Sequence, residues 1–148
     1  MNYSGLILND ITAAPGLCVS FFTQGCPHRC KGCHNPETWN FDGGKEFTTG
    51  TLNEIINGLT AQGIQRDLCI MGGEPLCDEN AFLTYLVIKE VKEKVPDAKI
   101  YIWTGYTYEE LETNKSELND RINKKEKNIL KMNDKKYEQS NKQNKDAI

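Results

Sequence analysis

The sequence has no apolar run long enough to cross a membrane and no targeting segment at its N-terminus. Its longest apolar stretches, such as 6–8 and 86–88, fall far short of the ~20 residues that a spanning helix requires. The first residues, MNYSGLILND, lack the basic start, the apolar core and the small-residue cleavage site of a secretory signal. We therefore expect a protein that is neither inserted in a membrane nor secreted.

The sequence also lacks a large excess of charge of either sign. Its net charge of −3 over 148 residues gives no electrostatic reason to expect nucleic acid or an anionic membrane as the main partner. A chain of this length fits a single domain. In the cytoplasmic setting that we expect, the six cysteines are metal ligands or buried thiols rather than disulfides.

The end of the chain differs in composition from the rest. Residues 112–148 contain no glycine, proline, cysteine, tryptophan or phenylalanine, and they carry a charge of +3 against −6 for residues 1–111. Lysine and asparagine dominate, and the apolar residues are too sparse to form a continuous stripe. Because such a segment buries too little apolar surface to offset its ordering entropy, we predict a folded domain at 1–111 followed by a tail, a frayed helix passing into disorder.

Short apolar runs alternate with amphipathic segments along residues 1–111. The run LCVSFFT at 17–23 has the character of a strand covered on both faces, and the segment 3–8 is expected to pair with it. Helices are indicated by apolar residues three and four apart, with capping-box residues at Thr51–Glu54. The predicted elements are strands at 3–8, 17–23, 67–71 and 99–103, and helices from 51 to a stop at Gly63, over 78–95, and from 107 onward.

This alternation predicts the α/β class, with parallel strands joined by right-handed helical crossovers. A complete eight-unit barrel needs at least ~200 residues, so we expect a partial barrel or an open parallel sheet. In either form, ligands bind beyond the carboxyl ends of the strands. The segments expected there are 24–34, 72–75 and 104–106.

Three cysteines follow the strand at 17–23 in the spacing C-x3-C-x2-C, namely Cys26, Cys30 and Cys33. Three thiolates so close together suit either an iron–sulfur cluster or zinc. Structural zinc sites have four ligands, usually from two paired knuckles, and the sequence has no second C-x2-C. A fourth ligand from His28 or His34 would be strained, because both lie in the same short loop. The spacing therefore favours a four-iron cluster with one iron open to a small molecule.

The remaining cysteines leave an alternative open. Cys18 and Cys69 lie in predicted strands, where a free cysteine is usually a small buried hydrophobe. Cys77 comes shortly after the second of these strands. Folding could still bring one of the three to the cysteine cluster as a fourth ligand.

A second motif, Gly72-Gly73-Glu74-Pro75, ends the strand at 67–71. Two glycines let the backbone approach a ligand closely, and the carboxylate of Glu74 can accept hydrogen bonds from an ammonium group. On its own this string also describes an ordinary turn with a surface glutamate. Its expected position at the same sheet edge as the cysteines makes it informative.

The two motifs together resemble a known family. TQGCPHRCKGCHNPETW, followed about forty residues later by MGGEPL, is similar to the radical S-adenosylmethionine (SAM) superfamily. Within it, residues 3–111 most resemble the small activating proteins of anaerobic ribonucleoside-triphosphate reductases. After Leu111 the strand–helix units that usually follow in the family are missing, and our hypothesis is that the chain is truncated or frameshifted there.

The resemblance implies a site and an activity. Cys26, Cys30 and Cys33 would bind a [4Fe-4S] cluster, and SAM would chelate its open iron. SAM contacts would come from Gly32, Cys33 and His34 and from Gly72, Gly73 and Glu74. Family members cleave SAM reductively to methionine and a 5′-deoxyadenosyl radical, which takes a hydrogen from a glycine of the reductase. The implied partners are that glycyl-radical subunit and a flavodoxin-like or other low-potential electron donor.

Other functions fit parts of the same pattern. CHNPETW also resembles activators of other glycyl-radical enzymes, such as pyruvate formate-lyase, which are usually longer. The unusual tail favours a module that binds the reductase without cleaving SAM. A domain stabilised by structural zinc is a further alternative.

Overall fold

The structure, a computed structural model, describes residues 1–146, with side chains described as far as Ile129 and at Lys131. Contacts divide the chain into two compact units, Met1–Tyr108 and Glu109–Ile148. No helix in the described part of the chain combines the length and the apolarity needed to cross a bilayer.

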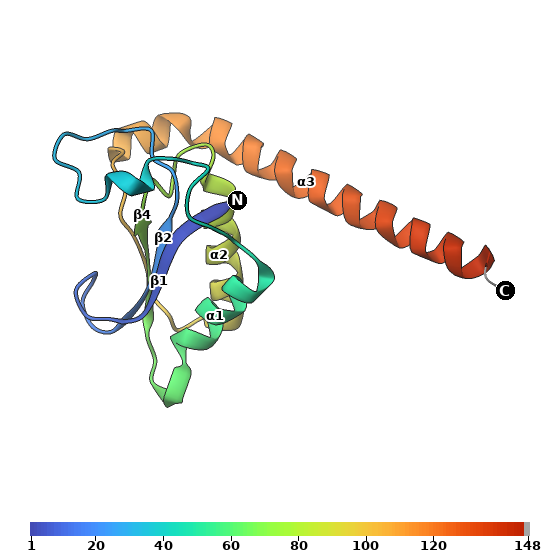
Figure 1. Ribbon diagram of the computed structural model, residues 1–148, viewed down its shortest axis with the longest axis horizontal. Helices are drawn as coiled ribbons and strands as arrows, with labels where there is room; N and C mark the ends of the chain where they lie inside the picture. Colours follow the sequence, from blue (N-terminus) through green and yellow to red (C-terminus); the bar gives the residue numbers. More distant parts are fainter. Residues whose placement is uncertain (147–148) are drawn as a thin grey trace. The chain divides into compact units, whose positions relative to one another are not determined.

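The first unit is built on a five-stranded open sheet in the order β3-β1-β2-β4-β5 (Figure 1). Its strands are β1 (Asn2–Asp10), β2 (Cys18–Thr23), β3 (Lys45–Glu46), β4 (Asp67–Gly72) and β5 (Ile100–Ile102). The predicted α/β class is confirmed, and so is the pairing of 3–8 with 17–23.

The expectation of a wholly parallel sheet is wrong. Strands β2, β4 and β5 are parallel, but β1 pairs antiparallel with β2, and β3 pairs antiparallel with β1. The reason lies in the link between β1 and β2, residues 11–17. A parallel connection needs a crossover of about a dozen residues or more, and this link is too short for one.

Two helices, α1 (Thr49–Leu59) and α2 (Ala81–Lys94), cover one face of the sheet (Figure 1). Apolar residues of both helices meet those of β2 and β4 in a single core. Its buried members are Val19, Phe21, Ile55, Leu59, Leu68, Ile70, Leu83, Val87, Val91 and Val95. This core fixes β2 and β4 side by side, so the loops after these two strands emerge at the same edge.

The start of α1 differs from the prediction. The sequence pattern places a capping box at Thr51–Glu54, but the helix begins one turn earlier, with Thr48 as N-cap. The backbone N–H of Thr51 donates to the Thr48 hydroxyl, and the backbone N–H of Thr48 donates to the Thr51 hydroxyl. A threonine at the third helical position thus takes the reciprocal role that glutamate or glutamine usually has.

A buried arginine fixes the C-terminal end of α1. Arg66 is only 3% exposed, and its guanidinium donates to the carbonyl oxygens of Gly58, Ala61 and Ile64 and to the Asn9 side chain. Positive charge is favourable near carbonyls at a helix C-terminus, where the macrodipole is negative. No local pattern in the sequence predicts this anchor.

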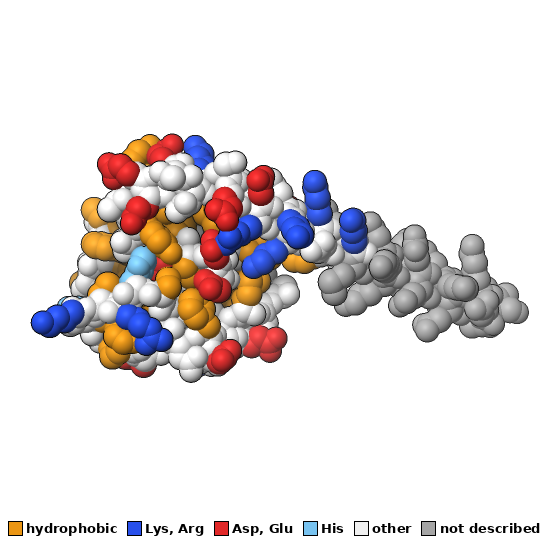
Figure 2. Space-filling view, turned by 90° about the horizontal axis from the view of Figure 1, so that it is seen from above, with side chains coloured by type: hydrophobic (Ala, Val, Ile, Leu, Met, Phe, Trp, Pro, Cys, Tyr) orange, Lys and Arg blue, Asp and Glu red, His pale blue; other side chains and the backbone are white. Residues whose placement is uncertain are grey.

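The second unit is helical. Helix α3 (Tyr108–Asp146) continues through the segment for which sequence analysis expected a helix passing into disorder. Its described surface is strongly polar, with Lys and Arg side chains along it (Figure 2). Pairs at i, i+4 such as Glu117 and Arg121, whose side chains are 2.6 Å apart, support such a helix. The predicted domain boundary after residue 111 stays a prediction.

Candidate functional site

Three loops meet where the parallel strands end. The backbone N–H of Gly73 donates to the carbonyl oxygen of Thr23, and that of Glu74 donates to the carbonyl oxygen of Gly25. The backbone N–H of Gly105 donates to the carboxylate of Glu74. Segments 24–34, 72–75 and 104–106 therefore share one sheet edge, as the alternation of strands and helices predicts.

The cysteine loop, residues 26–33, is fixed at its base. Backbone N–H groups of Gly25 and Cys26 donate to the carbonyl oxygens of Thr38 and Trp39. Gly25 has a φ of +98°, and a Cβ at this position would overlap the ring of Phe41. Only glycine combines this left-handed backbone with such close packing.

All three cysteines of the cysteine loop are at least partly accessible to solvent. Cys30 is exposed, whereas Cys26 and Cys33 are partly exposed, and all three are free. The backbone N–H of Cys33 donates to the carbonyl oxygen of Cys30. Burial raises the pKa of the Cys26 thiol, so this thiol holds its proton more tightly than an exposed one until a metal displaces it.

The three loop cysteines suit a metal group by their chemistry. Soft thiolates favour iron–sulfur clusters and zinc over hard cations. Among the described residues, no three histidine, cysteine, aspartate or glutamate side chains are gathered closely enough to hold a single metal ion. The fit therefore rests on the donor set itself: three free thiols within eight residues of a loop that is pinned at its base.

The other three cysteines are buried. Cys18 and Cys69 are fully buried and Cys77 is 2% exposed. Cys18 is the first residue of β2 and the cysteine loop follows the last, so about 16 Å of strand separates them. Burial raises the pKa of Cys69 and Cys77 to about 12 and also raises that of Cys18, which keeps all three protonated at neutral pH. The thiol of Cys77 donates to the carbonyl oxygen of Glu74.

Gly72 and Gly73 bring the turn after β4 close to the backbone after β2. Gly72 has a φ of +105°, and a Cβ on it would lie 2.7 Å from the backbone nitrogen of Thr23. A Cβ on Gly73 would collide with the carbonyl oxygen of Gly25. Sequence analysis assigned these glycines to the close approach of a ligand. The structure shows that they also permit the close approach of the protein's own backbone.

The carboxylate of Glu74 joins all three loops. Glu74 is 1% exposed. Its Oε1 accepts from the backbone N–H of Leu76 at 2.9 Å and from the hydroxyl of Thr104 at 2.7 Å. Its Oε2 lies 2.9 Å from Nε2 of His28 and accepts from the backbone N–H of Gly105 at 2.7 Å. A carboxylate offers about four lone-pair positions, so this set of partners fills it.

The rings of His28 and Tyr106 complete this network. They lie edge to face with centroids 4.6 Å apart. Burial raises the pKa of Tyr106 to about 12, so its phenol is neutral at physiological pH. The backbone behind Glu74 is held by Asn80, whose side-chain amide donates to the carbonyl oxygens of Gly25 and Glu74.

Known proteins are similar to this chain over most of its length. A family model described as a 4Fe-4S single cluster domain matches residues 13–148. The anaerobic ribonucleoside-triphosphate reductase-activating protein of Enterobacteria phage T4 is 37% identical over 111 residues, which cover 75% of this chain and 70% of the phage protein. The protein of that name from Escherichia coli K12 is 34% identical over 124 residues, 83% of this chain and 80% of the relative. The one from Vibrio cholerae is 35% identical over 119 residues, 80% and 77%. The chain belongs to the family of anaerobic ribonucleoside-triphosphate reductase-activating proteins.

Membership in this activating-protein family fits the position of the cysteine loop. Cys26, Cys30 and Cys33 are the accessible cysteines of the first unit and lie at the edge where ligands of such sheets bind. Gly32 and His34, the other residues expected near a cofactor in this loop, are exposed. Gly32 has a φ of +78° and open space where a Cβ would be.

Several residues that hold the carboxylate of Glu74 were not expected from the sequence. Thr104 and Gly105 hold the carboxylate of Glu74, and His28 joins it to the cysteine loop. Two features of the sequence pointed to these residues. Thr104 and Gly105 follow β5, whose carboxyl end converges with those of the neighbouring parallel strands, and His28 lies within the C-x3-C spacing. The individual partners could not be read from that placement.

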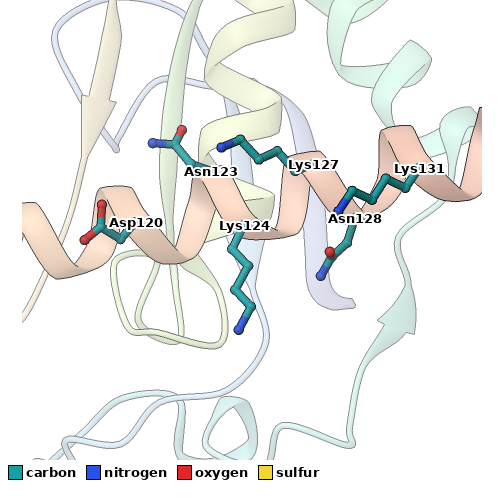
Figure 3. A pocket seen from close by; sticks show the side chains of 6 residues that line it. All are labelled: Asp120, Asn123, Lys124, Lys127, Asn128 and Lys131. Atoms are coloured by element: carbon teal, nitrogen blue, oxygen red, sulfur yellow. The ribbon is translucent and has the colours of Figure 1, made fainter.

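Hollows elsewhere in this family member are less suited to a cofactor. One of about 290 Å³ lies between the β1–β2 turn and the end of β5, where the indole N–H of Trp103 donates to the carbonyl oxygen of Ala13. Another lies along helix α3, and the side chains that line it are Asp120, Asn123, Lys124, Lys127, Asn128 and Lys131 (Figure 3). All six come from one helix, so this feature is a surface depression rather than an enclosed site.

Proposed function

We propose that the protein is a radical SAM activase that generates a glycyl radical on an anaerobic ribonucleoside-triphosphate reductase. The observation that carries this proposal is the meeting of two motifs at one sheet edge. The three-thiol loop follows β2, the Gly-Gly-Glu-Pro turn follows β4, and hydrogen bonds from Glu74 join them. The chain's family membership supplies the class of partner.

Cys26, Cys30 and Cys33 are the proposed ligands of a [4Fe-4S] cluster. When bound, a cluster with one open iron supplies the electron that cleaves SAM to methionine and a 5′-deoxyadenosyl radical. The chain's own part is to hold the three thiolates and to shield them on one side. Trp39 is partly buried beside the loop, with the guanidinium of Arg29 5.6 Å from the centre of its ring.

The proposed SAM contacts come from two segments of the same edge. One lies in the cysteine loop and just after it, and the other is the turn after β4; they comprise Gly32, Cys33, His34, Gly72, Gly73 and Glu74. Because the carboxylate of Glu74 already accepts from four groups, an ammonium group near it would compete with donors such as His28. The parallel strands β2, β4 and β5 support the further proposal that the sheet is a radical-SAM-type partial barrel.

The proposed setting is the reducing cytoplasm. All six cysteines are free, which suits a compartment that keeps thiols reduced. A low-potential donor such as a flavodoxin would supply the electron. We propose neither nucleic acid nor a membrane as a partner.

Electron paramagnetic resonance on the partner enzyme tests this function. The protein is loaded with iron and sulfide without oxygen, then mixed with SAM, a reductant and the anaerobic reductase. We expect a glycyl-radical signal on the reductase, and no such signal with the Cys33→Ala variant. A signal on pyruvate formate-lyase alone would favour the second activase class. Tight binding to the reductase without any radical would favour the non-catalytic module.

A further inference from the structure

We propose that His28 is a positioning residue that holds the cysteine loop against Glu74, whether or not a metal is bound. The pairing is visible in the structure, and only its importance for cluster binding rests on the proposed function. His28 lies midway between Cys26 and Cys30 in the chain. Its Nε2 lies 2.9 Å from Oε2 of Glu74, and the exposed fractions of the two side chains are 21% and 1%.

The direction of this hydrogen bond follows from the chemistry of its partners. Oε2 of Glu74 already accepts from the backbone N–H of Gly105 and a ring nitrogen of histidine can donate, so we assign His28 as the donor and Glu74 as the acceptor. Hydrogen bonds to a charged acceptor are stronger than neutral ones, especially where water is excluded. Tyr106 packs edge to face on the same imidazole, so the ring is held on two sides.

The rest of the cysteine loop has backbone hydrogen bonds at its ends, and the guanidinium of Arg29 lies over the ring of Trp39. Backbone hydrogen bonds of Gly25 and Cys26 fix its base, and the bond from Cys33 to Cys30 closes its far end. Between them Arg29 has a φ of +50°, in the left-handed region that side chains other than glycine rarely adopt. The His28–Glu74 contact therefore ties down the part of the loop that is least favourable for the backbone.

Gly105 makes room for the pair. A Cβ on this residue would lie 2.8 Å from Cδ2 and 3.0 Å from Nε2 of His28, and 3.4 Å from Oε2 of Glu74. The loop after β5 thus fits closely against the imidazole. An alanine here would push His28 away without touching either partner's chemistry.

A loop that is ordered in advance loses less entropy when it binds a ligand. With His28 in place, the cysteine loop is already ordered when iron arrives. Without His28, the same three thiols lie on a loop that is less ordered before iron binds.

Hydrogen–deuterium exchange on the reduced, metal-free protein tests this role. Wild type is compared with three test variants, His28→Phe, His28→Gln and Gly105→Ala, and with one control variant. Phenylalanine keeps a ring against Tyr106 but cannot donate, whereas the glutamine amide can reach the place of Nε2 and donate. Lys31→Gln, an exposed change in the same loop, is the matched control.

We expect exchange of the hydrogen-bonded amides of Cys26 and Cys33 to become about tenfold to hundredfold faster in His28→Phe, because a hydrogen bond to a charged group no longer opposes local opening of the loop. Gly105→Ala should behave similarly, and His28→Gln and Lys31→Gln should resemble wild type. Amides of β4 should be unchanged in all four variants. Unchanged loop exchange in His28→Phe, failure of His28→Gln to restore it, or an equal increase in β4 would each overturn the proposal. Because no cluster is present, these results do not depend on whether the protein cleaves SAM.

Discussion

Replacing Glu74 with glutamine tests how strongly this carboxylate holds the three loops together. The change keeps the shape of the side chain but turns one acceptor oxygen into an amide that can only donate. If the amide replaces Oε1, it faces the backbone N–H of Leu76. If it replaces Oε2, it faces the backbone N–H of Gly105. In both orientations a backbone donor loses its acceptor, because an N–H group cannot reverse its role.

The magnitude follows from burial. Glu74 is 1% exposed, so water cannot readily replace the lost acceptor. A buried donor left without a partner costs about 1–3 kcal/mol, and the bonds that remain also lose their charge-assisted character. We therefore expect Glu74→Gln to lower the free energy of unfolding by about 2–4 kcal/mol.

Urea unfolding of the reduced, metal-free protein, followed by circular dichroism, measures this loss. The matched control is Glu93→Gln on the exposed surface of α2, which should change the free energy of unfolding by less than about 0.5 kcal/mol. A loss for Glu74→Gln no larger than that of the control would refute the hydrogen-bond network described here.

Other changes test separate parts of the account. Replacing any one of the three loop cysteines with alanine should abolish SAM cleavage, whereas Cys69→Ala should leave the iron content intact and cost about 1 kcal/mol of packing. Arg66→Lys should lower the free energy of unfolding by about 2 kcal/mol, because an ammonium cannot reach all four acceptors. The Thr12 N–H and the hydroxyls of Ser20 and Thr12 lower the pKa of Asp10 below its ordinary 3.8. The free energy of unfolding should therefore fall as the pH drops from 3.8 through this lowered value. Asp10→Asn should reduce this loss of stability in acid and should lower the free energy of unfolding by about 1 kcal/mol at pH 7.

The main strands and helices could be predicted from the sequence because they depend on regular patterns of apolar residues. Apolar runs bounded by glycine and proline mark β2 and β4, and residues three and four apart mark α1 and α2. The convergence of their loops follows from the geometry of parallel strands. The pairing of β1 with β2 was expected from the turn between them, but the antiparallel direction that this short link imposes was not.

The details of the site depend on partners that no local pattern specifies. Glu74 takes its hydrogen bonds from three separate loops, and the identity of each donor is decided by tertiary packing. The N-cap of α1 lies at Thr48 rather than Thr51, because Thr51 takes the reciprocal third-position role that the pattern gave to Glu54. Arg66 was missed because a lone arginine before a strand is usually solvated.

The most direct test of the central claim is anaerobic reconstitution with iron and sulfide, followed by a SAM-cleavage assay with dithionite. We expect a brown protein with about four iron atoms per chain that releases 5′-deoxyadenosine and methionine from SAM. The Cys30→Ala variant should release neither. A colourless protein that retains zinc, or a fully loaded protein that leaves SAM intact, would contradict the claim.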